Sequence, residues 1–401
     1  MKILIVSQCF YPEEFRINDL VASFVEKGHQ VTVLTGKPNY PKGEYFAGYK
    51  FWGVQRELYQ GAHVIRVPVI RRGRGGGFKL AMNYLSFVIF GCWYVLTHKI
   101  EVDTIFCFAP SPITQVYPAL IAKYKTKAKA SLWVQDLWPD SVVAVGAAKQ
   151  DGVMWNMLNW MVTSIYRHCD LIFIQSKAFK QSICAKGNFE DKIVYAPNWA
   201  EDLYINTIGD QSKYQNLIPN GFIVMFAGNI GAAQDFDSIL NAAELTQSIG
   251  DIKWVIVGDG RVRAEMERKC ERKGLTNTVK FVGRFNSTEM PHFFIHADIM
   301  LVSLKHEDIF ACTIPSKIQT YMAAGKPIVS MLDGVGNDII EEAGCGLTAG
   351  AGDYRTLANN VIRLYKSPKT SLEEMSVCAK QYYNLHFDKK YIVDRILTTI
   401  K

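Results

Sequence analysis

The sequence predicts an α/β protein made of two doubly wound, Rossmann-like domains. Near its beginning, an apolar run at 2–7 (KILIVS), a helical pattern at 18–27 and a second apolar run at 30–35 (QVTVLT) follow one another. This succession is typical of a βαβ unit, whose strands are parallel. The second half begins in the same way, with the run 222–227 (FIVMFA) and a helical pattern at 236–243. Uninterrupted apolar runs of this length are typical of strands that helices cover on both faces.

The other elements of the first domain alternate in the same manner. Short apolar runs predict strands, and longer stretches with a period of 3.6 residues predict helices. Residues 36–51, which are rich in Gly, Pro and Tyr, predict a long ordered loop. A linker is expected to begin at Pro197, so the first domain spans 1–197. Strands are expected at 63–69, 103–108, 130–134 and 169–176, and helices at 111–122, 153–168 and 178–187.

The second domain is predicted to span 198–385 and to repeat the alternation. A Gly-rich turn is expected at 333–338. The last segment, 386–401, is predicted to return as a helix to the first domain. Strands are expected at 252–257, 280–282, 299–304, 328–331 and 344–348, and helices at 262–273, 289–297, 318–324, 354–365 and 371–385.

Residues 78–98 form an apolar segment whose environment the sequence leaves open. No charged side chain occurs in the 18 residues between Lys79 and His98, which approaches the length of a membrane-spanning helix. A core helix, interrupted by polar residues such as Asn83, and an element on a membrane surface are the other two interpretations. The basic turn at 71–77 (RRGRGGG) favours the membrane surface, because cations beside apolar side chains attract anionic lipid.

Composition indicates a globular protein with a basic first half. The 401 residues are 49% hydrophobic and 21% charged, which is sufficient for two separate cores. The net charge is +7, and residues 1–200 contain 23 Lys and Arg against 14 Asp and Glu. This bias predicts an anionic partner, but no long basic run or RNA-binding signature indicates nucleic acid. Nine cysteines without a CxxC pair predict reduced thiols in the cytoplasm and no metal site.

The loop after the first strand argues against a nicotinamide-dependent oxidoreductase. Its sequence, QCFYPEEF at 8–15, contains no glycine. A dinucleotide site at this position needs glycines, because the backbone must approach a pyrophosphate closely.

The segment 314–327 contains the clearest candidate for a binding site. It reads IPSKIQTYMAAGKP, so Pro315 and Ser316 open a helix that Gly325 and a following Pro end. Free N–H groups at a helix start, a hydroxyl and the Lys317 ammonium together suit an anion. Helix capping uses the same residue types, so capping alone remains the alternative interpretation.

The wider pattern resembles glycosyltransferase family 4, in particular the bacterial O-antigen and capsule branch with putative L-fucosamine transferases. The resemblance rests on PSK at 315–317 followed by TYMAAGKP at 320–327, on QDLWPDS at 135–141 and on PEEFR at 12–16. It covers essentially the whole chain. It implies the GT-B architecture, in which the two domains face each other across a cleft. It also implies a retaining, metal-free glycosyltransferase of the hexosyltransferase type that uses a UDP-sugar.

The resemblance assigns the donor site to the second domain. The donor residues it implies are Gly228, Asn229, Gln234, Gly258, Gly260, Arg261, Gly283, Arg284, Pro315, Ser316, Lys317 and Thr320. Glycines at strand exits would let the diphosphate approach the backbone, and Lys317 would neutralise its charge. This chain departs from the family in one respect: the paired glutamates of the family fall here on Cys312 and Thr320. The contacts to the donor sugar are therefore less well defined than the diphosphate contacts.

The resemblance assigns the acceptor to the first domain. It implies Glu13, Arg16 and Asn18 as acceptor-binding residues, with Arg16 on an acceptor phosphate. It also implies Asp136 as a catalytic residue, in addition to Lys317. For Arg16 a solvated charge at a helix end is the alternative, and for Asp136 a helix N-cap.

The acceptor implied by the resemblance is an undecaprenyl-diphosphate-linked saccharide, and the sugar is N-acetyl-L-fucosamine or a related amino sugar. The protein would then act in O-antigen or capsule biosynthesis, as a peripheral protein on the cytoplasmic face of the inner membrane. A sugar-nucleotide hydrolase or epimerase of the same fold is one alternative function. A non-catalytic subunit of polysaccharide assembly is another.

Overall fold

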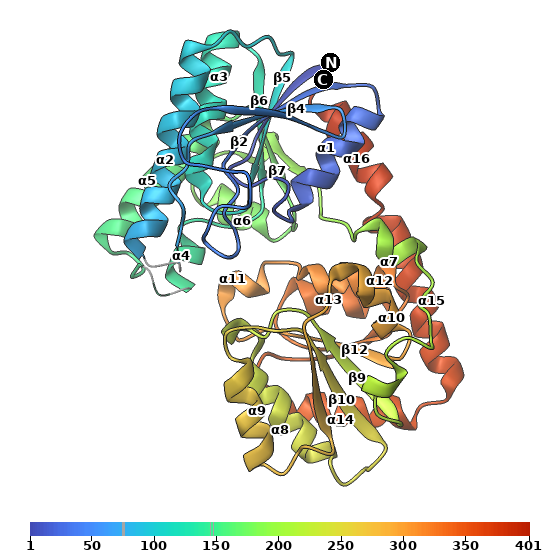
Figure 1. Ribbon diagram of the computed structural model, residues 1–401. Coiled ribbons are helices and arrows are strands. Elements are labelled where there is room, and N and C mark those ends of the chain that lie inside the picture. The colour runs from blue at the N-terminus through green and yellow to red at the C-terminus, as the bar shows by residue number, and fades with distance from the viewer. Residues whose placement is uncertain (74–76, 145, 147) are drawn as a thin grey trace. The chain divides into compact units, whose positions relative to one another are not determined.

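The computed structural model describes residues 1–73, 77–144, 146 and 148–401. They form two compact units, Met1–Pro197 with Lys390–Lys401 and Asn198–Lys389, and each unit has its own parallel-type sheet with helices against it (Figure 1). The predicted pair of doubly wound domains is thereby confirmed. Arg74 of the predicted basic turn lies outside the described residues.

The first unit contains an eight-stranded sheet in the order β3-β4-β2-β1-β5-β6-β7-β8. All neighbouring strands are parallel except β3 and β4, which are antiparallel. The sequence analysis missed β3 because its sequence, QRELY, alternates polar and apolar residues and lacks the apolar run of a buried strand. The strands are β1 (Lys2–Val6), β2 (Gln30–Gly36), β3 (Gln55–Tyr59), β4 (Ala62–Val67), β5 (Thr104–Ala109), β6 (Lys129–Val134), β7 (Leu171–Ile174) and β8 (Ile193–Tyr195).

Seven helices of the described residues belong mainly to this unit. The predicted return of the C-terminal segment is visible in α16, which lies beside α1 (Figure 1). An ion pair of 2.6 Å between Lys27, just after α1, and Asp394 holds it there. The helices are α1 (Arg16–Glu26), α2 (Gly77–Thr97), α3 (Tyr117–Thr126), α4 (Asp140–Ala144), α5 (Val153–His168), α6 (Phe179–Cys184) and α16 (Lys389–Thr399).

The second unit contains a six-stranded parallel sheet in the order β11-β10-β9-β12-β13-β14. Successive residues of β9 face opposite cores: Val224 packs with Phe236 of α8, whereas Met225 packs with Met322 of α12. The sheet is thus covered on both faces, as the apolar runs predict. The strands are β9 (Phe222–Ala227), β10 (Ile252–Val257), β11 (Val279–Gly283), β12 (Ile299–Ser303), β13 (Ile328–Met331) and β14 (Gly346–Ala349).

Two stretches of the second unit differ from the prediction. The turn expected at 333–338 is wrong in its second half, because α13 begins at Val335, directly after Gly334 with a φ of 71°. The polar loops around 200–220 and 305–313 contain the short helices α7 and α11. The helices are α7 (Asp202–Asn206), α8 (Phe236–Thr246), α9 (Arg263–Arg272), α10 (Met290–Phe294), α11 (Asp308–Ala311), α12 (Ser316–Ala323), α13 (Val335–Ala343), α14 (Tyr354–Lys366) and α15 (Lys369–His386).

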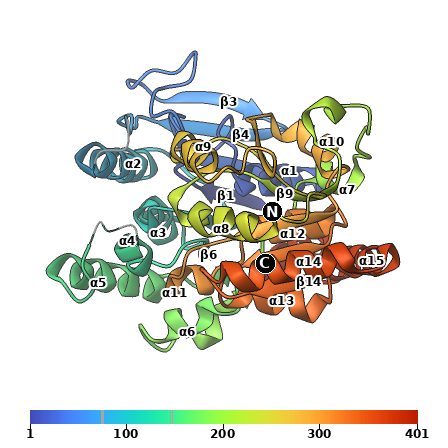
Figure 2. The same cartoon turned by 90° about the horizontal axis from the view of Figure 1, so that it is seen from below.

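Helix α2 is long and apolar enough to cross a membrane by length and composition, and a third of its most apolar window is buried. Its buried residues include Phe87, Gly91 and Val95, which pack on the unit, while other large apolar side chains are exposed. The helix is therefore neither a fully buried core helix nor detached from the domain. In Figure 2 it lies at the margin of the first unit.

The guanidinium of Arg66 organises the edge of the first sheet. Arg66 of β4 is completely buried. Its Nε donates to the Glu57 carboxylate at 2.6 Å, and its terminal nitrogens donate to the carbonyl oxygens of Gly36, at 3.3 Å, and Tyr11. The Cζ atom of Arg66 lies 5.0 Å from the ring centre of Tyr49. One cation thus joins strands β2, β3 and β4 to the loop after β1.

We expect Arg66→Met to destabilise the first unit strongly, by about 3–5 kcal/mol, because Glu57 and two carbonyls lose their partner in a buried place. Arg56→Met on the neighbouring strand is the matched control. Arg56 is exposed and makes one long contact, 3.3 Å to the Tyr94 hydroxyl, so its loss should cost less than about 1 kcal/mol. Urea unfolding followed by circular dichroism measures both, and equal losses would contradict the role of Arg66.

Candidate functional site

The carboxyl edge of the second sheet, at its switch point, is where this type of sheet places ligands. The chain order reverses between the neighbouring strands β9 and β12. In doubly wound sheets, ligands bind beyond the carboxyl ends of the strands at such a point. The loops after these strands contact each other, since Ser303 Oγ donates to the Gln234 carbonyl at 2.7 Å and the Lys305 N–H to Ala233 at 2.9 Å.

Three of the predicted glycines pack against one another at the exits of β9, β10 and β11. The Gly228 N–H donates to Val257 at 2.9 Å, and the Gly258 N–H donates to Gly283 at 2.8 Å. A Cβ on Gly258 would lie 1.9 Å from the Gly228 carbonyl oxygen, and one on Gly260 would lie 2.2 Å from that of Ile230. These glycines are therefore required by the close contact of the strand exits, independently of any ligand.

Lys317 lies across the first of these glycines. A Cβ on Gly228 would come within 2.8 Å of Lys317 Cε. The ammonium donates to Gln234 Oε1 at 2.9 Å and lies 4.8 Å from the ring centre of Phe226. Burial lowers the pKa of Lys317 to about 8. The structure therefore brings together three predicted donor residues, Gly228, Gln234 and Lys317, around one desolvated cation.

The N-terminus of helix α12 lies at the same carboxyl edge of the sheet. Pro315, which the sequence placed in the first turn, is the N-cap with φ −63° and ψ 129°, and no side chain of the described residues caps this end by a hydrogen bond. Ser316 is exposed, and Thr320, one turn further, is half-buried. Uncapped N–H groups next to a lysine form a suitable place for an anion.

The other predicted donor residues lie at the periphery. Asn229, Arg261 and Arg284 are exposed on the loops after β9, β10 and β11. Cys312 ends α11, and its N–H donates to Asp308 at 3.3 Å.

The sequence analysis missed Arg263, at the start of α9. Its guanidinium donates to Glu267 at 2.8 Å and lies 3.9 Å from the Asp259 carboxylate. It also comes within 3.6 Å of where a Cβ of Gly283 would be. The spacing of these three charges, four residues apart in sequence, is the signal that could have identified it.

A second missed pair follows β12 and β13. His306 Nδ1 lies 2.6 Å from the Asp333 carboxylate, and this contact raises the pKa of His306. Asp333 also accepts the N–H of Ala351 at 2.9 Å, which is the main cause of its lowered pKa. The pair adds a titratable group to the same edge of the sheet.

In the first unit, the carboxylate of Glu13 is used to hold two loops. It is 3% exposed, and it accepts the N–H groups of Phe10 at 3.2 Å, Asn39 at 2.8 Å and Tyr40 at 2.7 Å. Burial raises the pKa of Glu13 in spite of these bonds. Asn18 braces the same loop, because its amide donates to the Glu13 carbonyl at 2.6 Å. Both residues shape the predicted acceptor loop from within.

Arg16 and Asp136 lie at the carboxyl edge of the first sheet. Arg16 is the first residue of α1, which follows β1, and Asp136 follows β6. Burial raises the pKa of Asp136 to about 6, and the polar groups of Ser141 and Trp138 beside it offset part of the rise. The nearest helix begins at Asp140, so Asp136 is not its N-cap.

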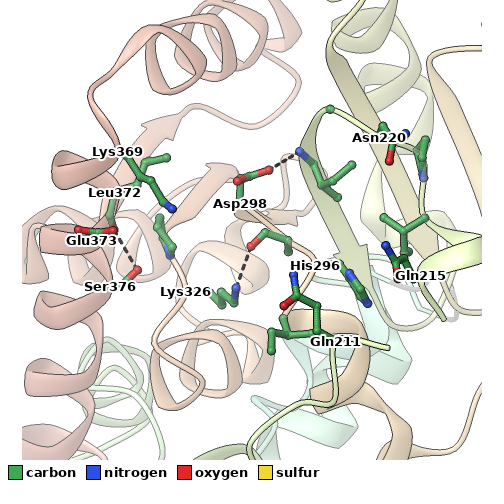
Figure 3. A pocket seen from close by; sticks show the side chains of 17 residues that line it. Gln211, Gln215, Asn220, His296, Asp298, Lys326, Lys369, Leu372, Glu373 and Ser376 are labelled. Atoms are coloured by element: carbon green, nitrogen blue, oxygen red, sulfur yellow. Dashed lines mark hydrogen bonds between the residues drawn. The ribbon is translucent and has the colours of Figure 1, made fainter. Parts of the chain in front are cut away.

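A cavity of about 480 Å³ lies in the second unit, at the amino ends of β9, β12 and β13 (Figure 3). Asp298 accepts the Ile223 N–H there at 2.7 Å, and Lys326 donates to the Ala297 carbonyl at 2.8 Å. Charges of both signs line this cavity, and it opens at the edge of the sheet opposite the glycine loops. Within the described part of the chain, no three His, Cys, Asp or Glu side chains gather as a metal site.

Two family models match this chain. Residues 221–367 match the model described as "Glycosyl transferases group 1", and residues 14–199 match a "Glycosyl transferase 4-like domain". WcaI of Escherichia coli K12, provisionally assigned as a colanic acid biosynthesis glycosyl transferase, is 25% identical over 338 residues, 81% of this chain and 82% of WcaI. WbjE of Pseudomonas aeruginosa, provisionally assigned as a glycosyltransferase, is 25% identical over 66% of each chain.

Solved structures share the fold. HepE of Anabaena in complex with UDP has a TM-score of 0.72 and 17% identity, over 100% of this chain and 99% of HepE. WaaG, a glycosyltransferase involved in lipopolysaccharide biosynthesis, has a TM-score of 0.69 and 13% identity, over 100% of both chains.

We expect Glu13→Ala to destabilise the first unit by about 2–4 kcal/mol, because three backbone N–H groups lose their acceptor. Glu14→Ala is the matched control. Glu14 is exposed, so its removal should change stability by about 0.5 kcal/mol or less. Limited proteolysis should also cleave the Glu13 variant faster near Asn39 and Tyr40. Equal stability and equal cleavage of the two variants would show that Glu13 does not hold these loops.

Proposed function

Because this chain is a glycosyltransferase with the GT-B fold, we propose that it transfers a sugar from a UDP-sugar to a lipid-linked saccharide. The observation that supports this most directly is the Lys317 ammonium beside Gly228 and Gln234, next to the uncapped start of α12. A nucleoside diphosphate needs such a group of positive charge and free N–H donors. The UDP complexes of HepE, which has the same fold, favour uridine as the base.

The chemistry requires that the negative charge of the departing diphosphate is stabilised. The bond between the anomeric carbon and the phosphate oxygen breaks, and a bond from that carbon to the acceptor hydroxyl oxygen forms. Lys317 and the α12 N–H groups would stabilise the developing charge in place, without reorganisation of solvent. In a retaining reaction on one face of the sugar, the departing phosphate oxygen takes the acceptor proton. The resemblance implies this course and needs no resident metal.

Asp136 is the proposed polar contact to the acceptor hydroxyl or the donor sugar. Its pKa of about 6 leaves it mainly ionised at neutral pH while burial makes its hydrogen bonds strong. Asp136 belongs to the first unit and Lys317 to the second. The proposed contact of Asp136 is therefore argued from the first unit alone, and the diphosphate contact of Lys317 from the second unit alone.

The acceptor loops of the first unit suit an anionic, lipid-linked acceptor. Tyr40 stacks near Phe15, with ring centres 5.4 Å apart, and the Arg72 guanidinium lies 5.0 Å from the Tyr40 ring centre. Arg16 adds a second cation at the start of α1. We propose that these groups bind the diphosphate and first sugar of an undecaprenyl-linked saccharide at the cytoplasmic face of the inner membrane.

The biological setting is proposed from the relatives. The names of WcaI, of AmsK from Erwinia amylovora and of WaaG refer to colanic acid, amylovoran and lipopolysaccharide biosynthesis. They support a role in a bacterial surface polysaccharide, such as O-antigen or capsule. N-acetyl-L-fucosamine or a related amino sugar remains the donor sugar that the sequence resemblance implies.

One observation supports a second candidate, a non-catalytic subunit of polysaccharide assembly. Cys312 and Thr320 replace the two glutamates that the family pattern has at these positions. A cradle that binds UDP and transfers no sugar from any donor would favour that candidate. Release of UDP from a sugar donor without any acceptor would instead favour a hydrolase.

We expect UDP to raise the melting temperature of the second unit by about 5–10 °C at a hundredfold excess over its Kd, and GDP, CMP and NADH to raise it much less. Lys317→Met should abolish the UDP shift, because the diphosphate loses its cation. Lys326→Met is the matched control, since Lys326 is also a half-buried lysine whose pKa is lowered to about 8, but it lies at the opposite edge of the sheet. Loss of the shift in both variants, or in neither, would argue against the proposed cradle.

We expect UDP affinity to fall as the pH rises above about 8. The pKa of Lys317 is lowered to about 8, so the ammonium is present below this pH and is lost above it. A bound diphosphate favours the charged form, so binding should take up about half a proton at pH 8 and close to one proton by pH 9.5. Titration calorimetry in two buffers of different ionisation enthalpy measures this uptake. The same uptake in Lys317→Arg, which stays charged, would assign the proton to another group.

A further inference from the structure

Helix α2 exposes a row of large apolar side chains on its outer side. Five large apolar side chains on it are exposed: Phe78, Leu85, Ile89, Trp93 and Leu96. Trp93 is 66% exposed and Phe78 is 79% exposed. The spacing of seven, four, four and three residues places them along one side of the helix. Together with Trp52, these residues are called the α2 outer face.

The inner side of α2 contains two polar side chains that are bonded to the domain, beside the buried Phe87 and Val95. The Asn83 amide donates to the Ile70 carbonyl at 2.5 Å, and its oxygen accepts from Gln8 Nε2 at 2.7 Å. Ser86 Oγ accepts the Ile70 N–H at 2.9 Å. Both side chains are buried. The buried polar side chains are tolerated because they are hydrogen-bonded, whereas exposure of a row of large apolar side chains is costly in water.

The helix is also fixed at its far end and along its length. Lys125 Nζ donates to the carbonyls of Val95, Leu96 and His98 at 2.8–2.9 Å, which satisfies the C-terminal end of α2. A Cβ on Gly91 would lie 2.7 Å from Pro118 Cγ, so α2 and α3 pack closely. A helix held in this way cannot leave the domain to cross a bilayer. Its outer face can only lie against a surface.

Aromatic and cationic groups border the apolar stripe. Phe51 packs edge-on against Phe90 of α2 at 5.8 Å and against Trp52 at 4.7 Å, which places the exposed Trp52 beside the stripe. Lys79 is exposed at the start of α2, next to Gly73. The loop with the exposed Lys42 is bonded to this segment, since the Gly73 N–H donates to Gly43 at 3.0 Å. Tryptophans at an edge and lysines beside apolar side chains are what an anionic bilayer surface binds.

We propose that the α2 outer face lies on an anionic bilayer surface and holds the acceptor loops there. This proposal rests on the proposed function, because it names the partner that a lipid-linked acceptor requires. The link to the loops is the buried bond from Asn83 to Gln8, the residue that follows β1 and Ser7. Asn39, which Glu13 also holds, lies 3.4 Å from the Asn83 amide and contacts it. Docking of α2 therefore places the predicted acceptor loop after β1 and the loop after β2 at the lipid headgroups.

The test is flotation of the full-length protein with vesicles of phosphatidylcholine that contain 30 mol% phosphatidylglycerol. We expect the wild type to float. The variant Ile89→Ser/Trp93→Ser should bind the vesicles at least about tenfold more weakly, because two apolar anchors are removed. Binding should weaken with vesicles of pure phosphatidylcholine and with rising salt.

The matched control is Met157→Ser/Trp160→Ser on α5. These two side chains are also large, apolar and exposed, at 60% and 73%, but they belong to another helix of the first unit. We expect this variant to float like the wild type. Equal loss of binding in both variants, or no binding of the wild type, would overturn the proposal.

Light scattering tests the other occupant, a second copy of this chain. A dimer that Ile89→Ser/Trp93→Ser converts to a monomer, with no vesicle binding, would make the α2 outer face a dimer interface and overturn the lipid proposal. The UDP melting shift separates this inference from the proposed function. Protein that floats without any UDP shift contradicts the glycosyltransferase proposal alone, and protein that shifts with UDP but does not float contradicts the lipid proposal alone.

Discussion

The desolvated ammonium of Lys317 is the constraint on which the second unit depends. A Cβ on Gly228 would lie 2.8 Å from Cε of this lysine, whose charge is turned toward Gln234. Among the described residues no carboxylate pairs with Lys317, and its desolvation costs folding free energy, which the lowered pKa expresses. A bound anion would recover this cost. The fold thus holds a cation at the carboxyl edge of the sheet, where the strand order reverses.

The first unit solves a different problem, the ordering of long loops at a sheet edge. Its loops after β1 and β2 combine aromatic side chains, such as the buried Phe10, with buried polar groups. Arg66 and Glu13 each bond to the backbone of two segments, and Asn83 bonds to the Ile70 carbonyl and to the side chains of Gln8 and Asn39. Such groups are costly unless every polar atom is satisfied, and they then specify one loop arrangement. The two units thus prepare their edges by different means, one with a desolvated ammonium and the other with buried side chains that hydrogen-bond to several loops.

The sequence was sufficient for the fold because parallel strands are uninterrupted apolar runs. A motif indicated Lys317 and the glycines, and their role in donor binding stays a prediction. The sequence failed for β3, whose one face meets water, and for α13, whose start depends on the positive φ of Gly334. It also gave no sign that the Glu13 carboxylate is buried under three N–H groups, and the acceptor contact of Glu13 stays a prediction. Contacts between segments that are distant in sequence determine such roles, whereas sequence patterns report only on residues that are close in sequence.

Helix α2 shows the same limit at a surface. Its sequence is apolar nearly all around, so composition fits a membrane span, a core helix and a surface helix equally. The structure distinguishes these interpretations, because Asn83 and Ser86 are hydrogen-bonded to the domain and fix the inner side of the helix. Phe87 and Val95 are buried on the same side, which leaves the α2 outer face exposed. The acceptor loops and the apolar surface are therefore two sides of one helix, and a substitution that frees Asn83 should disturb the loops without removing the surface.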